Sequence, residues 1–165
     1  MKFLEKDLEV IIWEADNKKL QERNLPIEGN KVRQLKIGNY GIADLVTFKK
    51  CNSGYDGAFP YLKITVYELK KEKVGISAFL QAIKYCRGIK SYMKKHKPNI
   101  LFTIEIVLIA KEVDLSGDFI YLTDLFYSCE TFGSVNSVLF YTFNYDFDGI
   151  NFINESSYDI TNKGF

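Results

Sequence analysis

One long helix-forming segment lies between two strand-forming segments, and this order limits the folds open to the chain. Residues 61–70 are rich in β-branched and aromatic side chains, and residues 101–110 form a nearly continuous apolar run, so both segments are expected to be strands. Residues 75–97 form a helical segment that Pro98 ends. Because a helical crossover joins parallel strands of one sheet, the chain is expected to build a mixed sheet.

The remaining segments complete an α/β (α+β) fold, a central mixed β-sheet flanked by helices. Its expected order is helix, three strands, helix, strand, helix and two strands. Tight-turn signals occur at Gly38-Asn39-Tyr40-Gly41 and at Asp146-Phe147-Asp148-Gly149. The further elements expected are a helix at 3–23, strands at 32–37, 42–48, 137–145 and 150–153, loops at 24–30 and 51–59, and a short helix at 118–127. With 165 residues, one domain is expected over 1–165, with core motifs in 3–110 and the acidic residues 111–165 completing it.

Composition excludes several classes of protein. The chain has 13 Phe, 11 Tyr and only 3 Pro, so it has enough apolar surface to fold. It has no window of about 18 apolar residues, so no membrane span is expected. Three widely spaced cysteines and one histidine make a zinc site improbable and favour reduced thiols in the cytoplasm.

The net charge of +1 conceals a strong asymmetry along the chain. Residues 1–97 hold 20 of the 22 basic and 11 of the 21 acidic residues, a net charge of +9, whereas residues 98–165 carry −8. Such an asymmetry indicates an anionic partner at the basic part. The alternative is that the two parts are solvated surfaces that neutralise each other in space.

Charged residues interrupt the apolar pattern of two strands. Side chains alternate along a strand, so each of these sets should share one face: Leu62, Ile64, Val66, Glu68 and Lys70, and Ile42, Asp44, Val46 and Phe48. Unpaired charges on an inner face would cost several kcal/mol each. Either the acids and the lysine form a buried salt bridge, or the two carboxylates hold a hard cation such as Mg²⁺.

These residues resemble a known family. The spacing Glu5…Asp44…Glu68-Leu69-Lys70…Gln81…Tyr85 is similar to that of the PD-(D/E)xK nuclease superfamily, which has the restriction-endonuclease-like fold. The resemblance covers about residues 3–97, and the strand at 101–110 fits the family core. Ala43 stands where the superfamily's name has a proline, and no motif from residue 98 onward identifies a substrate. The acid of the first helix is either Glu5 or Glu9, of which Glu5 fits the pattern better.

The resemblance implies a role for each motif residue. Asp44, Glu68 and the Leu69 carbonyl would bind Mg²⁺ or Mn²⁺. Lys70 would orient the attacking water and stabilise charge on the phosphate, and Glu5 would hold a second metal or a metal-bound water. Gln81 would orient water or Lys70. Tyr85 would pack or contact the strand backbone, with a direct role at the site as the alternative. The catalytic set is therefore Glu5, Asp44, Glu68, Lys70 and Gln81.

The second long helix carries a basic stripe, defined here as Lys84, Arg87, Lys90 and Lys94. A solvated helix face is one interpretation, and contact with a nucleic-acid backbone is the other. The expected function is a divalent-metal-dependent nuclease acting on DNA, that is, a deoxyribonuclease. The alternative is a non-catalytic module that binds nucleic acid or protein on a nuclease fold. Endonuclease, exonuclease and junction resolvase activities, DNA or RNA as substrate, and monomer or homodimer all remain open.

Overall fold

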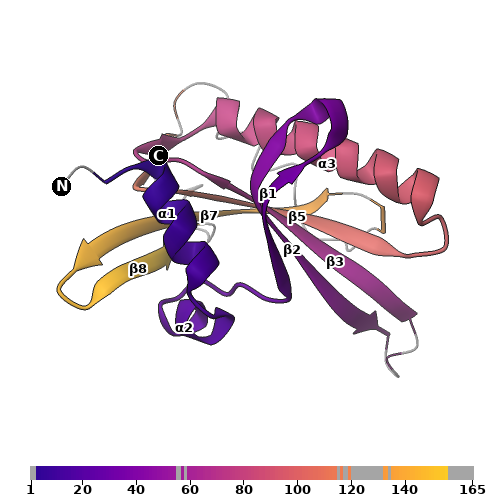
Figure 1. Cartoon of the computed structure of the whole chain (residues 1–165), viewed down its shortest axis with the longest axis horizontal. Helices are drawn as coiled ribbons and strands as arrows, with labels where there is room; N and C mark the ends of the chain where they lie inside the picture. The colour runs from indigo at the N-terminus through magenta and orange to yellow at the C-terminus, as the bar shows by residue number, and fades with distance from the viewer. Residues whose placement is uncertain are drawn as a thin grey trace.

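A six-stranded mixed sheet forms the centre of an α+β fold (Figure 1). The computed structural model describes residues 3–54, 57, 59–114, 116, 119, 132–133 and 135–155. The strands lie in the order β1 (Asn30–Lys36), β2 (Ile42–Ser53), β3 (Phe59–Leu69), β5 (Phe102–Ala110), β7 (Val135–Asp146) and β8 (Gly149–Asn154). The β3–β5 and β5–β7 pairs are parallel and the other neighbours are antiparallel. The mixed sheet expected from the helical crossover is confirmed.

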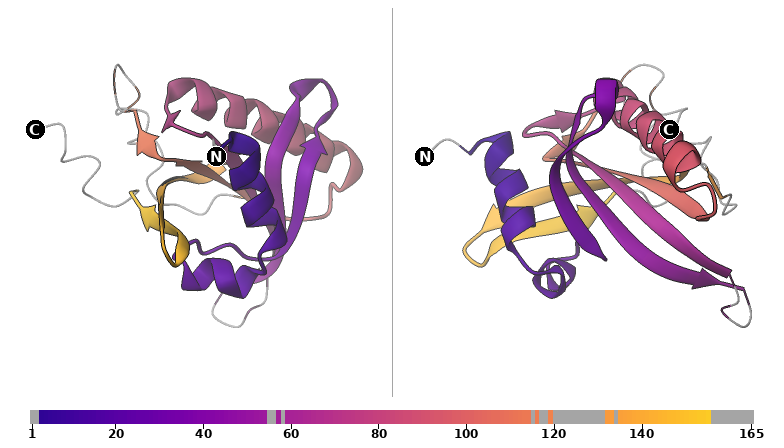
Figure 2. Two further views of the ribbon diagram at one scale, coloured as in Figure 1. Left: turned by 60° about the vertical axis from the view of Figure 1, so that its left-hand side comes forward. Right: turned by 45° about the vertical axis from the view of Figure 1, so that its right-hand side comes forward.

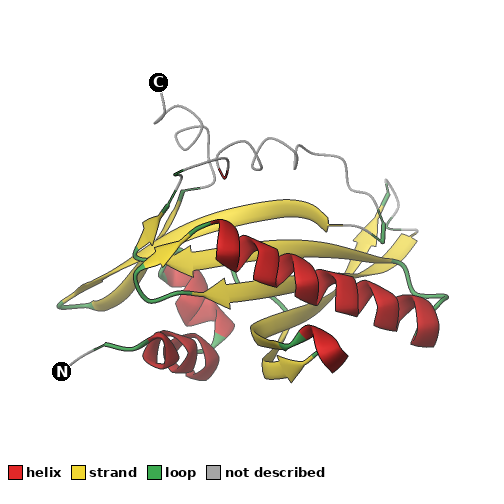
Figure 3. Ribbon diagram, turned by 90° about the horizontal axis from the view of Figure 1, so that it is seen from above, coloured by secondary structure: helices red, strands yellow, loops and turns green. Residues whose placement is uncertain are grey.

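Helix α3 (Ile76–His96) covers one face of this sheet (Figure 3). It connects β3 to the parallel β5, as expected from the apolar segments on either side of it. Its buried side chains include Phe79, Tyr85 and Ile89, which pack against Val66 of β3 and Ile106 of β5 in one apolar cluster. Because the helix rests on the two central strands, its position relative to the ends of β2 and β3 is fixed.

Two helices, not one, cover the opposite face (Figure 2). The single helix expected at 3–23 is wrong, since α1 (Glu5–Glu14) and α2 (Asn17–Glu22) are separate. The chain is extended at Ala15 and Asp16, and the Asp16 carboxylate caps α2 by accepting the Lys19 N–H at 2.8 Å. Apolar spacing continues through the break, so periodicity alone did not reveal it.

The β2–β3 hairpin is longer than expected. Residues 51–59 were expected to be a loop, but β2 continues to Ser53 and β3 begins at Phe59. Since β1 pairs with β2 only as far as Phe48, the end of the hairpin projects beyond β1 (Figure 1). A short parallel ladder of β4 (Lys73–Val74) and β6 (Glu112–Val113) was not expected, and the helix expected at 118–127 lies almost entirely outside the described residues.

The β1–β2 hairpin twists at Gln34 and Asp44, so that its side chains change faces there; we call this change the turnover. Ala43 packs on the α3 side of the sheet, whereas Leu45, two residues on, packs on the α1 side, and Gln34 has a φ of 51°. The expectation that Ile42, Asp44, Val46 and Phe48 share one inner face is therefore wrong, and Ile42 is 50% exposed. The turnover carries the short helix η1 (Gly38–Tyr40) onto α3.

None of the helices found in the described ranges has the length and apolar character needed to cross a membrane.

Candidate functional site

The candidate site lies where β2 and β3 separate. Their ladder ends at the Leu45–Tyr67 pair, which leaves the Leu69 N–H without a strand partner on that side. The Asp44 carboxylate takes this place, because its Oδ2 accepts the Leu69 N–H at 3.0 Å. Asp44 thus lies between the two strands, close to the plane of the sheet.

Glu68 is a buried carboxylate with one unsatisfied oxygen. Its exposed fraction is only 1%, and Lys70 Nζ lies 2.9 Å from Oε1. Oε2 has no hydrogen-bond partner, although buried carboxylate oxygens are normally satisfied. Burial, reinforced by the negative charge of Asp44, raises the Glu68 pKa from 4.5 to about 7, even though Lys70 acts in the opposite direction.

Lys70 contacts acids of both helix α1 and strand β3. Besides Glu68, its Nζ meets Glu5 Oε1 of helix α1 at 3.6 Å. Burial by itself would lower the Lys70 pKa, but the carboxylates of Glu68, Glu5 and Asp44 outweigh burial and raise it. The ammonium group therefore stays protonated at the centre of three acids.

Glu9, the alternative acid of the first helix, has a different environment. It is buried, forms an ion pair with Arg33, and accepts a hydrogen bond from Gln34 Nε2 at 2.6 Å. Glu5 is about half exposed and contacts Lys70. The geometry thus brings Glu5 to the site and assigns Glu9 to holding α1 on β1.

The residues around Glu68 Oε2 fit a divalent cation. Burial raises the Asp44 pKa, partly offset by the hydrogen bond from the Leu69 N–H, and that hydrogen bond leaves Oδ1 available. In an extended residue N–H and C=O point the same way, so the Leu69 carbonyl also faces Asp44. Within the described ranges no cluster of three or more His, Cys, Asp or Glu side chains is placed to hold a metal. Mg²⁺ is usually bound by one or two carboxylates together with substrate phosphates, which matches this smaller set.

Gln81 and Tyr85 lie on the α3 side of the site. Gln81 Nε2 donates to the Tyr85 hydroxyl at 2.6 Å. Gln81 was expected to orient either water or Lys70, and the first of these roles stays a prediction. Burial raises the Tyr85 pKa, and the charges of Glu68 and Asp44 raise it further. Gly41 allows the Tyr85 ring to approach, since a Cβ there would lie 2.9 Å from ring atom Cε1. These residues line an open hollow of about 720 Å³ beside the carboxylates.

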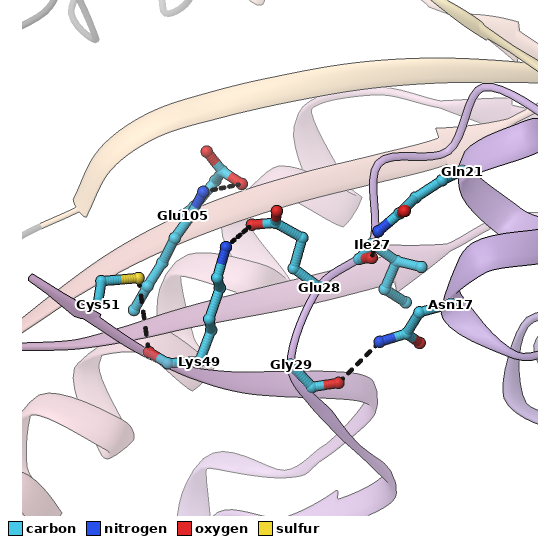
Figure 4. Close-up of polar contacts among 9 residues, drawn as sticks. Asn17, Gln21, Ile27, Glu28, Gly29, Lys49, Cys51 and Glu105 are labelled. Atoms are coloured by element: carbon cyan, nitrogen blue, oxygen red, sulfur yellow. Dashed lines mark hydrogen bonds and ion pairs between the residues drawn. The ribbon is translucent and has the colours of Figure 1, made fainter.

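The basic stripe is electrostatically unlike the opposite face of the sheet. There, Lys49 and Lys63 are paired with Glu28 and Glu105 (Figure 4). None of the stripe residues forms an ion pair within the described part of the chain, and Lys84 also lines the hollow beside Gln81. The stripe is therefore a surface of uncompensated positive charge that begins at the candidate site.

Two aromatic residues, one beside the site and one farther along α3, were not identified from the sequence. Tyr40 lines the hollow beside Gln81, and Tyr92 is 55% exposed on α3. The Tyr92 ring lies 4.7 Å from His96. For Tyr92 the sequence did contain a signal, because Tyr92 and His96 are four residues apart and so lie on one face of the helix.

Comparison of the chain with protein-family models, with curated proteins and with solved structures found no match.

A first prediction concerns the buried charge of Glu68. The folded state holds this proton up to about pH 7, whereas the unfolded chain releases it near pH 4.5. The free energy of unfolding of the metal-free protein should therefore fall as pH rises through this window. Glu68→Gln cannot ionise, so its stability relative to wild type should grow by about 3 kcal/mol from about pH 4 to about pH 8.

The measurement is urea unfolding in EDTA over this pH range. Glu72→Gln, which alters an exposed carboxylate, serves as the matched control and should show a constant difference from wild type. A pH-independent difference for Glu68→Gln would mean that the carboxylate is not strained in the folded protein.

A second prediction separates the two acids of α1. Glu9→Ala leaves Arg33 and Gln34 without their acceptor and should lower the free energy of unfolding by about 2 kcal/mol. Glu5→Ala removes an exposed partner and should change it by less than about 0.5 kcal/mol. Urea unfolding of both variants at neutral pH checks this, and equal losses would contradict the assignment of Glu9 as the structural acid.

Proposed function

We propose that this protein is a divalent-metal-dependent nuclease that hydrolyses DNA phosphodiester bonds. The observation that carries the proposal is the buried Glu68 Oε2. This oxygen has no hydrogen-bond partner, although the charged groups of Asp44 and Lys70 are close by. A structural salt bridge explains only Oε1, which pairs with Lys70. A cation shared by Glu68 and Asp44 would satisfy the second oxygen and would offset the repulsion between the two carboxylates.

The arrangement of the elements supports a restriction-endonuclease-like core for this proposal. Helix α1, strands β1 to β3, helix α3 and strand β5 follow in the expected order, with β1-β2-β3-β5 adjacent in the sheet. The motif spacing puts Glu68 and Lys70 on one side of the chain at the end of β3, and the tertiary structure adds Asp44, which accepts the Leu69 N–H there. Both agree with the same chemistry.

In the proposed reaction a water oxygen attacks phosphorus, one P–O ester bond breaks, and the leaving oxygen takes up a proton. A bound Mg²⁺ or Mn²⁺ would lower the pKa of water and offset charge on the phosphate. Asp44, Glu68 and the Leu69 carbonyl would hold this ion. The Lys70 ammonium is placed to orient the water and to stabilise charge that develops on the phosphate oxygens.

Glu5 and Gln81 would act at the borders of the site. Glu5 approaches Lys70 from α1 and would accept a hydrogen bond from a metal-bound water or hold a second ion. Gln81 is engaged with the Tyr85 hydroxyl, so we assign it to positioning Tyr85 and water in the hollow beside the carboxylates.

A binding module without catalysis is the second candidate. It is favoured by the two ion pairs of Lys70 with Glu68 and Glu5, which satisfy the lysine without any metal. Such a module would use the basic stripe for nucleic acid but would show no Mg²⁺-dependent cleavage. The two candidates therefore differ in the outcome of one assay.

The third prediction is for that assay, nicking of a supercoiled plasmid with and without Mg²⁺. Wild type should nick only with the metal. Lys70→Ala and Glu68→Gln should each reduce the rate by at least about 100-fold, because they remove charge stabilisation or a metal ligand. Lys71→Ala, which removes the neighbouring surface lysine paired with Glu72, should retain wild-type activity. Full Mg²⁺-dependent activity in Lys70→Ala would exclude this site as the catalytic centre.

The fourth prediction tests the basic stripe. Each phosphate that a cation neutralises adds about 0.9 to the log–log salt slope of duplex binding. The double variant Arg87→Ala/Lys90→Ala should therefore lower this slope by roughly one to two units, equally for all duplex sequences. Binding is measured over a salt titration in Ca²⁺, which is chosen to occupy the site without fast cleavage.

The matched control removes two exposed lysines from the other face of the sheet. Lys18→Ala/Lys19→Ala on α2 changes the net charge by the same amount, and both residues are exposed. Its slope should remain that of wild type. Equal slopes for wild type and the Arg87/Lys90 variant would show that the stripe is only a solvated helix face.

A further inference from the structure

A second hollow lies along α3, between its C-terminal half and the overturned tip of the β1–β2 hairpin. Its volume is about 520 Å³. Ile37, Phe48, Ile89 and Met93 make its walls apolar, while Tyr92 and His96 add adjacent aromatic rings. We call it the aromatic groove.

Close packing keeps the aromatic groove formed. Gly88 of α3 faces Ile37 and Tyr40, and a Cβ at this position would lie 2.4 Å from Ile37 Cγ2 and 2.7 Å from the Tyr40 ring. The absence of a side chain lets the hairpin tip rest directly on the helix. Its walls come from two elements in contact, so the groove is preformed.

The charged side chains that line the aromatic groove, Lys36 and Lys95, are both positive, and its lining includes no carboxylate. Neither Lys36 nor Lys95 forms an ion pair with any residue that the structure describes. An apolar slot with an exposed ring and a cationic rim is complementary to a ligand that joins flat aromatic groups to phosphates.

The aromatic groove shares one wall with the hollow that borders the candidate site. Tyr40 lines both the groove and the hollow that contains Gln81 and Tyr85. Along the helix, Gln81 and Tyr92 are eleven residues apart, which corresponds to about 16 Å. One chain of nucleotides can therefore reach from the catalytic end of α3 to the groove.

We propose that the aromatic groove binds an unpaired nucleobase of single-stranded nucleic acid, stacked against Tyr92, with the flanking phosphates at Lys36 and Lys95. Paired and stacked bases of a duplex keep their faces covered, whereas unpaired bases offer them to aromatic side chains. The inference rests on the proposed function in one respect: the bound nucleic-acid strand is taken to run from the proposed catalytic site to the groove. It narrows the substrate to nucleic acid with a single-stranded segment next to the cleaved bond.

The fifth prediction compares two 20-mers of equal phosphate number by fluorescence anisotropy in EDTA, where no cleavage occurs. One is oligothymidylate and the other is the same backbone with abasic sites. Tyr92→Ala should weaken binding of oligothymidylate about 5- to 100-fold and should change binding of the abasic oligomer less than about twofold. Tyr92→Phe keeps the ring and should bind oligothymidylate as wild type does.

Phe147→Ala is the control, because it removes a fully exposed aromatic ring from the β7–β8 turn. It should leave both affinities unchanged. Equal weakening for both oligomers, or none for either, would overturn the proposal, as would a wild-type protein that binds no single-stranded nucleic acid. The groove would then be a candidate site for a protein partner.

Together with the cleavage assay, this test shows which of the two proposals fails. If wild type nicks DNA with Mg²⁺ but Tyr92→Ala binds oligothymidylate normally, only the groove proposal fails. If Tyr92-dependent binding is found but wild type cleaves neither the plasmid nor oligothymidylate with Mg²⁺, the nuclease proposal fails and the groove proposal stands.

Discussion

The hydrogen bond from the Leu69 N–H to Asp44 is the contact on which the candidate site depends. Two antiparallel strands normally satisfy each other's backbone, and a carboxylate gains a place between them only where they separate. Here the β1–β2 hairpin turns over at Asp44, so β2 leaves β3 after the Leu45–Tyr67 pair. The same turnover places η1 on α3 and forms the aromatic groove. One local change of strand direction thus creates both the proposed metal site and the proposed base-binding site.

The charges at this point do not balance, because three carboxylates surround one lysine. Glu68 is almost fully buried, its pKa is raised to about 7, and only one of its oxygens has a partner. Lys70 reduces the cost, yet it is shared with Glu5. A divalent cation would lower the energy of this arrangement by adding positive charge beside the carboxylates of Glu68 and Asp44. Binding of such an ion to the folded state alone would also stabilise the fold.

Much of the fold follows from the sequence, because period-two and helical patterns are strong over 61–110. The limits of α3 and β5 are close to those expected. The break between α1 and α2 was missed because apolar spacing continues through Asp16, and the turnover at Asp44 was missed because it depends on tertiary contacts with α3. Motif spacing placed Glu68 and Lys70 on one side of β3, and they do form an ion pair. It favoured Glu5 over Glu9 but could not show what Glu9 does, since that depends on Arg33 and Gln34 of a different element.

The positions of the basic residues along α3 show which of them helix stability can explain. Lys94, Lys95 and His96 lie in the last turn, where positive charge stabilises the partial negative charge of a helix C-terminus. Helix stability therefore accounts for Lys94 without any ligand. That effect fades within one turn, so it does not explain Lys84, Arg87 or Lys90, which lie about one to three turns earlier. These three have no ion-pair partner among the described residues, and mutual repulsion along the stripe opposes folding. An anionic partner that extends from the carboxylate site along the helix gives all three a physical role.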